Sequence, residues 1–113
     1  MKNYLAKLIF NIENETKISQ FDEQIRLVSS INMESAFQKA RHIGKKEEET
    51  FLNTQNKSVN WKFIDVMDIY PLDPVKDGDQ IFSTTHEEED PNAFINYIRQ
   101  KAMVIQTKNL TFA

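Results

Sequence analysis

The side chains best suited to chemistry gather near residue 86, where one histidine precedes four carboxylates. The run is His86, Glu87, Glu88, Glu89 and Asp90. An imidazole beside carboxylates is a donor set that divalent metal ions accept. Neighbouring residues of an extended segment point in different directions, however, so consecutive ligands rarely converge on one ion. We therefore favour an exposed loop whose negative charge suits the N-terminus of a following helix, and we keep the metal site as an alternative.

A second pair of carboxylates, Asp65 and Asp68, interrupts an apolar stretch. If Asp65 faced the core, burial would raise its pKa and suit the group to acid–base catalysis. A β-bulge that shifts the alternation would instead turn both carboxylates outward, and this is the simpler interpretation. A small metal-dependent enzyme would need both groups to converge with the residues around His86. Trp61, in the same stretch, is expected to anchor the core or an interface.

Several catalytic and binding motifs are missing from the sequence. The chain has no cysteine, which excludes disulfide frameworks, thiolate metal sites and a cysteine nucleophile. Its two glycines cannot build a phosphate-binding loop. Asp73–Asp79 reads DPVKDGD, which lacks the ligand spacing of a calcium loop and predicts a turn. No catalytic residue, metal or cofactor is predicted, and an enzyme is the less favoured class.

Charge and hydropathy exclude other classes of protein. The net charge is −3, divided into +3 for residues 1–46 and −6 for residues 47–113. An acidic chain without a basic stripe is not expected to bind nucleic acid. No apolar run approaches a membrane span and no secretory leader is recognised, so the sequence predicts a cytoplasmic protein. The acidic part could steer a basic partner, which favours an inhibitor-like or immunity-like binding protein as an alternative function.

The elements that must position these side chains follow from periodicity. The length of 113 residues predicts one domain over 1–113, with an unassigned tail at 106–113. Alternating apolar residues predict strands over 3–12, 18–29, 58–70 and 80–86. Helical spacing predicts helices over 33–43 and from Pro91 onward, with Asn32 and Asp90 as N-caps. The sequence therefore predicts an α+β fold in the order ββαββα.

The strand order follows from which strands are apolar on both faces. Strands 3–12 and 58–70 carry apolar residues at both parities, which is typical of central strands. Strands 18–29 and 80–86 do not, so the expected antiparallel order is 2-1-3-4. The first helix presents Ala36, Phe37, Ala40 and Ile43 as its buried stripe. We expect it to break near Gly44 because Glu47, Glu48 and Glu49 suit a helix C-terminus poorly; a longer helix that reaches Leu52, with Gly44 as a close-packing point, is the alternative.

The ordered set of elements resembles a family of short, uncharacterised bacterial proteins catalogued as a domain of unknown function. The resemblance covers residues 4 to about 82 and leaves out the second helix. It implies a bacterial, cytoplasmic setting and transfers no catalytic residue. It rests on these segments: Tyr4-x-Ala6-Lys7-Leu8-x-Phe10, Phe21–Val28, Ala36-Phe37-x-x-Ala40, Gly44–Glu48 and Trp61–Tyr70.

The second apolar face of the predicted sheet suggests a non-catalytic interaction or structural protein. If both helices cover one face, the other is left bare, and monomers rarely expose an apolar patch of that size. A homodimer through the sheet faces would bury it, whereas helices on opposite faces would make a monomer sufficient. The interface candidates are Leu5, Ile9, Ile64, Val66 and Tyr70, with Trp61 as a further anchor.

Overall fold

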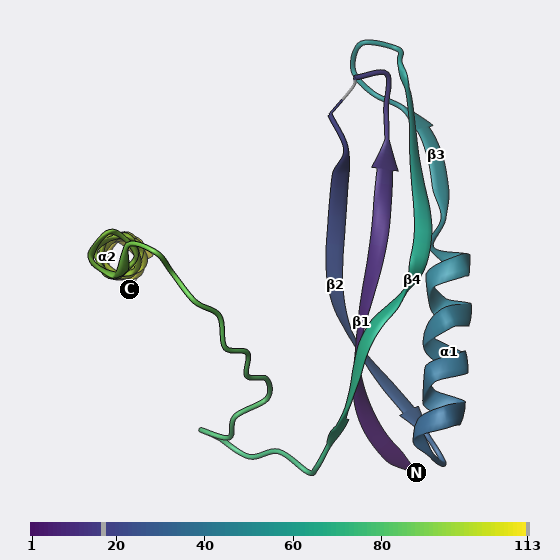
Figure 1. Cartoon of the computed structure of the whole chain (residues 1–113), viewed down its shortest axis with the longest axis horizontal. Helices are drawn as coiled ribbons and strands as arrows, with labels where there is room; N and C mark the ends of the chain where they lie inside the picture. The colour runs from purple at the N-terminus through teal and green to yellow at the C-terminus, as the bar shows by residue number, and fades with distance from the viewer. Residues whose placement is uncertain (17, 113) are drawn as a thin grey trace. The chain divides into compact units, whose positions relative to one another are not determined.

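The computed structural model describes the backbone of residues 1–16 and 18–112 (Figure 1). The elements follow the order β1 (Lys2–Glu13), β2 (Gln20–Ser30), α1 (Met33–Lys46), β3 (Glu49–Leu52), β4 (Ser58–Leu72) and α2 (Pro91–Phe112). The chain divides into two compact units, Met1–Ile81 and Phe82–Ala113. The first unit holds the whole sheet and α1; the second holds α2. The predicted α+β class is confirmed; the chain also runs ββαββα, but its last two strands are not the two that were predicted.

The sheet has four strands in the order β2-β1-β4-β3, and every neighbouring pair is antiparallel. The two strands predicted to be central, 3–12 and 58–70, are the central β1 and β4. The predicted order 2-1-3-4 is wrong in detail, because residues 80–86 form no strand and the predicted third strand, 58–70, is the fourth strand of the chain. The outer position beside β4 is taken by the short β3, whose Glu49 pairs with Trp61 and whose Leu52 pairs with Ser58.

A tight hairpin loop explains why β3 forms. Asn53 donates its backbone N–H to the carbonyl of Lys57, and its side-chain Oδ1 accepts hydrogen bonds from the amides of Gln55 and Lys57. Asn56 takes φ of 59°, a left-handed conformation that asparagine tolerates better than most residues. Residues 80–86 have no comparable partner strand, and Ile81 remains 48% exposed.

Helix α1 is longer than predicted, because it does not break at Gly44. Asn32 Oδ1 accepts from the Ser35 amide at 2.8 Å, which confirms the predicted N-cap. Gly44 is buried, and a Cβ added there would lie 2.6 Å from Phe63 Cζ. The residue is therefore a close-packing point, and the helix ends only after Lys46. Glu48 lies beyond that end, where its carboxylate accepts the Phe63 amide of β4 at 3.0 Å.

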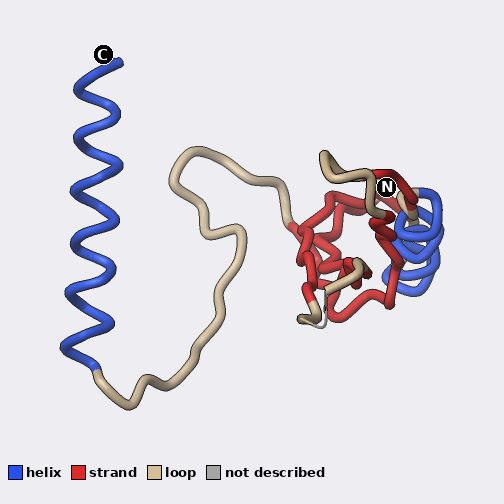
Figure 2. The backbone as a smooth tube through the Cα atoms, turned by 90° about the horizontal axis from the view of Figure 1, so that it is seen from above, coloured by secondary structure: helices blue, strands red, loops and turns tan. Residues whose placement is uncertain are grey.

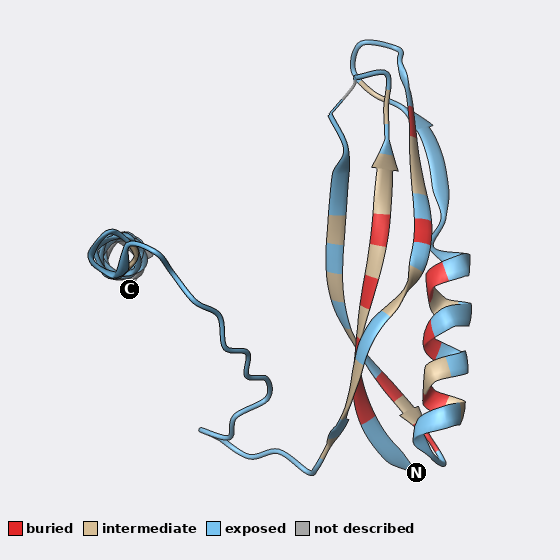
Figure 3. Cartoon of the chain, viewed as in Figure 1, coloured by how far each residue is buried: buried red, intermediate tan, exposed pale blue. Residues whose placement is uncertain are grey.

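The core lies between α1 and one face of the sheet (Figure 2 and Figure 3). Leu8 and Phe10 of β1 are fully buried, as are Ala36 and Ala40 of α1, whose small side chains let the helix approach the strands. The Phe10 and Phe63 rings are tilted against each other with centroids 5.6 Å apart. The remaining buried members of this cluster are Tyr4, Ala6 and Val28.

The second unit begins with an irregular segment and continues into α2. Asp90 Oδ1 accepts from the Ala93 amide at 3.1 Å, so the predicted cap before Pro91 is present. The helix extends to Phe112 and includes most of the segment left unassigned at 106–113. Within the described residues, no helix is long and apolar enough to cross a membrane. The prediction that 1–113 forms one domain stays a prediction.

Candidate interaction surface

The strand register shows which side chains lie on the face of the sheet away from α1. Directly paired residues of neighbouring strands point to the same face. Buried Leu8 pairs with Gln24 of β2 and with Val66 of β4, so these partners lie on the α1 side. Residues of the other parity make up what we call the open face. Its apolar members are Leu5 and Ile9 of β1, Phe21, Ile25 and Leu27 of β2, and Tyr70 of β4. Ile64 and Met67 of β4 join them, because each directly follows a side chain that packs in the core. The charged Lys7, Glu23 and Asp68 share this face.

Strand β2 is oriented with its apolar side chains away from α1. Phe21 is 60% exposed, Ile25 48% and Leu27 61%. The polar parity of the same strand lies on the α1 side, where Arg26 forms an ion pair with Glu47 at 3.6 Å. Within the first unit, the apolar side chains Phe21, Ile25 and Leu27 therefore face away from α1, with the exposed Glu23 between the first two.

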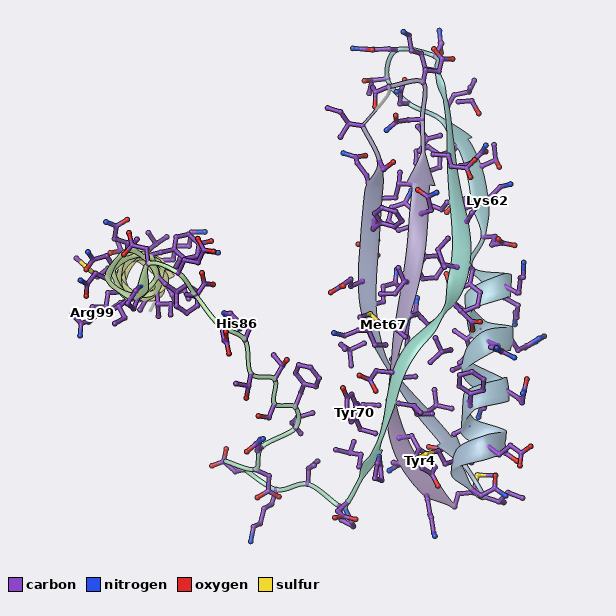
Figure 4. All side chains as sticks on the ribbon, in the orientation of Figure 1. Tyr4, Lys62, Met67, Tyr70, His86 and Arg99 are labelled. Carbon is purple, nitrogen blue, oxygen red and sulfur yellow. The ribbon has the colours of Figure 1, made fainter. Side chains whose placement is uncertain are left out.

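Two β-bulges in β4 extend the open face. The register with β1 shifts between Lys7 and Leu8 and again between Ile9 and Phe10, which leaves Met67 and Ile64 without direct partners. These residues are 65% and 55% exposed, respectively. Figure 4 shows Met67 and Tyr70 on the side of β4 away from α1. Each bulge adds one residue to β4, so that the core side chains of the strand point to the α1 side again after it. The added residues, Ile64 and Met67, lie on the open face.

The predicted interface residues divide between the two faces. Leu5 is nearly buried, with 8% exposure, and lies at the centre of the open face. Ile9 and Tyr70 are half-buried there, and Ile64 is exposed. Val66 and Trp61 instead pack against the core cluster under α1.

Asp65 lies between the two bulges, and although the register sets it opposite Ile9 of the open face, its side chain binds α1. Its two carboxylate oxygens accept from Nε and Nη2 of Arg41, each at 3.0 Å, and Oδ1 also accepts from the Val66 amide. These hydrogen bonds, led by that of Arg41, hold the pKa of Asp65 below its ordinary value. Arg41 in turn lies over the ring of Phe37, 4.4 Å from its centroid. The carboxylate is thus an ion-pair link between helix and strand.

Asp68 accepts a hydrogen bond from the phenol of Tyr70. This hydrogen bond raises the pKa of the Tyr70 hydroxyl, because the carboxylate stabilises its protonated form. In the register with β1, Asp68 is opposite Lys7. The open face therefore carries a small polar group within its apolar residues.

The acidic run belongs to the second unit. His86 Nε2 lies 3.2 Å from Glu88 Oε1, and its ring packs edge-on against Phe94. Glu87, Glu89 and Asp90 are exposed, and Asp90 caps α2. Among the residues that the structure describes, no group of three His, Cys, Asp or Glu side chains has an arrangement that could hold a metal ion.

Sequence reasoning missed four members of the open face: Phe21, Ile25, Leu27 and Met67. The alternation of β2 shows that Phe21, Ile25 and Leu27 share one side, but gives no reason to place that side outward. The pairing register between β1 and β2 could have placed them. The length of the hairpin loop decides which side chains of β2 share a face with the apolar side chains of β1. Met67 depends on the bulges, which no local pattern specifies.

The comparisons with known proteins assign the chain to a family. A family model described as a domain of unknown function (DUF4288) matches residues 3–83, and the chain belongs to this family. The match confirms the resemblance predicted from the sequence segments. It covers the unit that contains the sheet and ends before α2. No curated protein and no solved structure matches the chain.

Proposed function

We propose that the protein is a non-catalytic interaction protein that forms a homodimer through the open face of its sheet. The observation that supports this proposal is the outward direction of the β2 apolar row, flanked across β1 by exposed Ile64 and Met67 of β4. Apolar side chains that share one face and remain about half exposed or more are typical of a protein interface. A twofold axis would place the same residues against each other in both chains.

The chemistry of the open face favours an identical partner over a charged one. Its apolar residues come from three neighbouring strands and outnumber the charged side chains that share the face, which include Lys7, Glu23 and Asp68. Leu5 is only 8% exposed in the single chain, so a dimer would bury little more of it. Exposed residues such as Met67 would contribute most of the newly buried surface. Burying one such side chain contributes roughly 1.5–3 kcal/mol. In a symmetric dimer each of these residues occurs once in each chain, so its contribution to the free energy of association counts twice.

Light scattering after size exclusion tests the proposal. The chain mass is 13.3 kDa, and we expect the wild type to elute as an assembly of at least two chains. Met67→Lys should reduce the number of chains, because it places an ammonium in the contact at two symmetric positions. Ile31→Lys is a matched control, since Ile31 is 68% exposed in the turn before α1 and Met67 is 65% exposed in β4. A wild type with the mass of one chain at all concentrations would contradict the homodimer.

The two other functional hypotheses stay predictions. A metal-dependent enzyme would require the Asp65, Asp68 and His86 groups to act together, yet Asp65 binds Arg41, Asp68 binds Tyr70 and His86 contacts Glu88. An acidic partner-binding role is supported only by the exposed carboxylates between β4 and α2. Metal-dependent changes in melting temperature and salt-sensitive capture of a basic protein are their respective tests.

A further inference from the structure

The outer edge of β2 is a second surface of interest, distinct from the open face. β2 is the last strand of the described sheet, so only one of its edges bonds to a neighbour, namely β1. The pairing with β1 runs from Gln20 to Ser30 with no register shift. A regular edge strand of this length presents a row of backbone N–H and C=O groups that can pair with another strand.

Strand β2 carries the charged side chains Asp22, Glu23 and Arg26 but lacks the other devices that usually block such pairing. It contains no proline, glycine or lysine, and its register shows no bulge. Only the end near α1 is covered, because Lys39 Nζ donates to the carbonyl of Ser29 at 3.0 Å. The accessible part of the edge therefore runs from Gln20 to about Leu27.

The side chains on the α1 side of β2 form a short polar row with opposite charges at its ends. Gln24 Nε2 donates to Asp22 Oδ2 at 2.9 Å, and Arg26 Nη2 donates to Gln24 Oε1 at 2.7 Å. The acid and the base stand two residues on either side of the amide. A half-turn about Gln24 exchanges the positions of Asp22 and Arg26. Two copies of the row related in this way would therefore place opposite charges against each other.

We propose that β2 pairs antiparallel with β2 of a second copy of this chain, about a twofold axis at Gln24. In this register Asp22 of each copy faces Arg26 of the other, which gives two symmetric ion pairs. On the opposite side of the sheet, Phe21 of each copy faces Leu27 of the other. Opposite charges and apolar pairs directly across two antiparallel strands both stabilise their association.

The neighbouring registers fit less well. A twofold axis at Glu23 would set two glutamates directly against each other. An axis at Ile25 would bring Ser29 into the pairing, where Lys39 already occupies its carbonyl. The register at Gln24 avoids both conflicts.

This contact goes beyond the proposed homodimer, because it uses an edge of the sheet and not its open face. Pairing at β2 would join two sheets into one continuous sheet and align their open faces on one side. The face contact and the edge contact together would give an assembly of four chains.

A charge exchange tests the edge contact. Asp22→Arg and Arg26→Asp each place like charges opposite one another at both symmetric positions, so each should weaken association about tenfold or more and halve the number of chains. In an equimolar mixture, one copy carries arginine at both positions and the other carries aspartate at both. Two ion pairs therefore form between unlike copies, and the mixture should regain the wild-type mass. The double variant, in which both charges are exchanged, should regain it alone.

Light scattering gives these masses, and circular dichroism confirms that each variant is folded. Glu47→Gln is the first control, since it removes the partner of Arg26 within the same chain and should leave the mass unchanged. Met67→Lys tests the open face, and its effect should be independent of the charge exchange. If both single-charge variants keep the wild-type mass, or the mixture fails to regain it, the edge contact is wrong, whatever Met67→Lys does. If the wild type is a single chain, both contacts are wrong.

Discussion

Gly44 is the residue at which α1 comes closest to the sheet, and it offers a direct test of the core. Gly44→Ala would place a methyl group 2.6 Å from Phe63 Cζ and closer still to other atoms of the ring. The gain in helix propensity, about 1 kcal/mol, is smaller than the cost of overpacking, which is typically 1–3 kcal/mol. We expect a net loss of roughly 1 kcal/mol in the free energy of unfolding, measured in urea. Adding Phe63→Leu should recover part of this loss, and Gln38→Ala on the exposed side of α1 should be nearly neutral.

The Asp65–Arg41 ion pair predicts a dependence of stability on pH. The pKa of Asp65 is lowered from 3.8 in the folded state, so its contribution is present above the unfolded pKa and is lost as the pH falls through the folded pKa. The side chains are 46% and 45% exposed, so solvent screening limits the pair to about 1 kcal/mol or less. Asp65→Asn should be less stable than the wild type at pH 7 and nearly equal to it near pH 2. If Asp65→Asn lowered the free energy of unfolding equally at both pH values, the ion pair would not be the cause of the loss.

Residue types alone predicted part of this picture. The apolar parity of β1 and the stripe of α1 identified Leu8, Phe10, Ala36 and Ala40, because amphipathic spacing reflects burial directly. A β-bulge was the favoured interpretation of a carboxylate within an apolar parity, but it was expected to turn Asp65 outward, whereas the side chain binds Arg41 of α1. The partner of that carboxylate, Arg41, could not be predicted, because 24 residues separate the two positions and only the packing of α1 brings them together.

At the scale of elements, the N-cap of α1 decides where the helix begins. Asn32→Ala removes the acceptor of the Ser35 amide and should cost about 1 kcal/mol of stability. Asn32→Asp and Asn32→Ser keep an acceptor and should lose much less. Thermal melting followed by circular dichroism measures the difference. Equal melting temperatures for Asn32→Ala and Asn32→Ser would show that the cap contributes little.

The long elements were predictable from sequence, and the short strand was not. β1, β2 and β4 each contain 11 or more residues with clear alternation, and α1 has a strong cap and stripe. β3 has four residues, all exposed, so it shows no alternation of buried and exposed side chains. Its position depends on the Asn53–Lys57 loop and on a neighbour in β4. Residues 80–86 show the converse case, since they have the alternation of a strand but no partner.

At the scale of the whole chain, the segment between β4 and α2 separates the two units. Every side chain from 73 to 90 is exposed. A glutamate-specific protease should therefore cut first at Glu87–Glu89 and release α2 from a resistant fragment that contains the sheet. Replacing these three glutamates by glutamine should slow the first cut. First cuts at Glu13 or Glu23, within the strands, would contradict this division of the chain.

The candidate interaction surface could be predicted only in part. The prediction of a bare second face came from apolar residues at both parities of β1 and β4. The contribution of β2, which carries the argument, needed the observed register. The family match over residues 3–83 likewise coincides with the unit that holds this surface.

The position of β1 between β2 and β4 has a consequence for folding during synthesis. β1 and β2 form a local hairpin as soon as both have left the ribosome, but the other edge of β1 must wait for β4, whose last residue is Leu72. Until then Leu8 and Phe10 have neither α1 packed on them in its final place nor a complete sheet beneath them. Closing this long loop makes the contact order high, so the β1–β4 pairing is expected to set the folding rate. The nascent hairpin, with both of its faces partly apolar, is the species on which a chaperone would act.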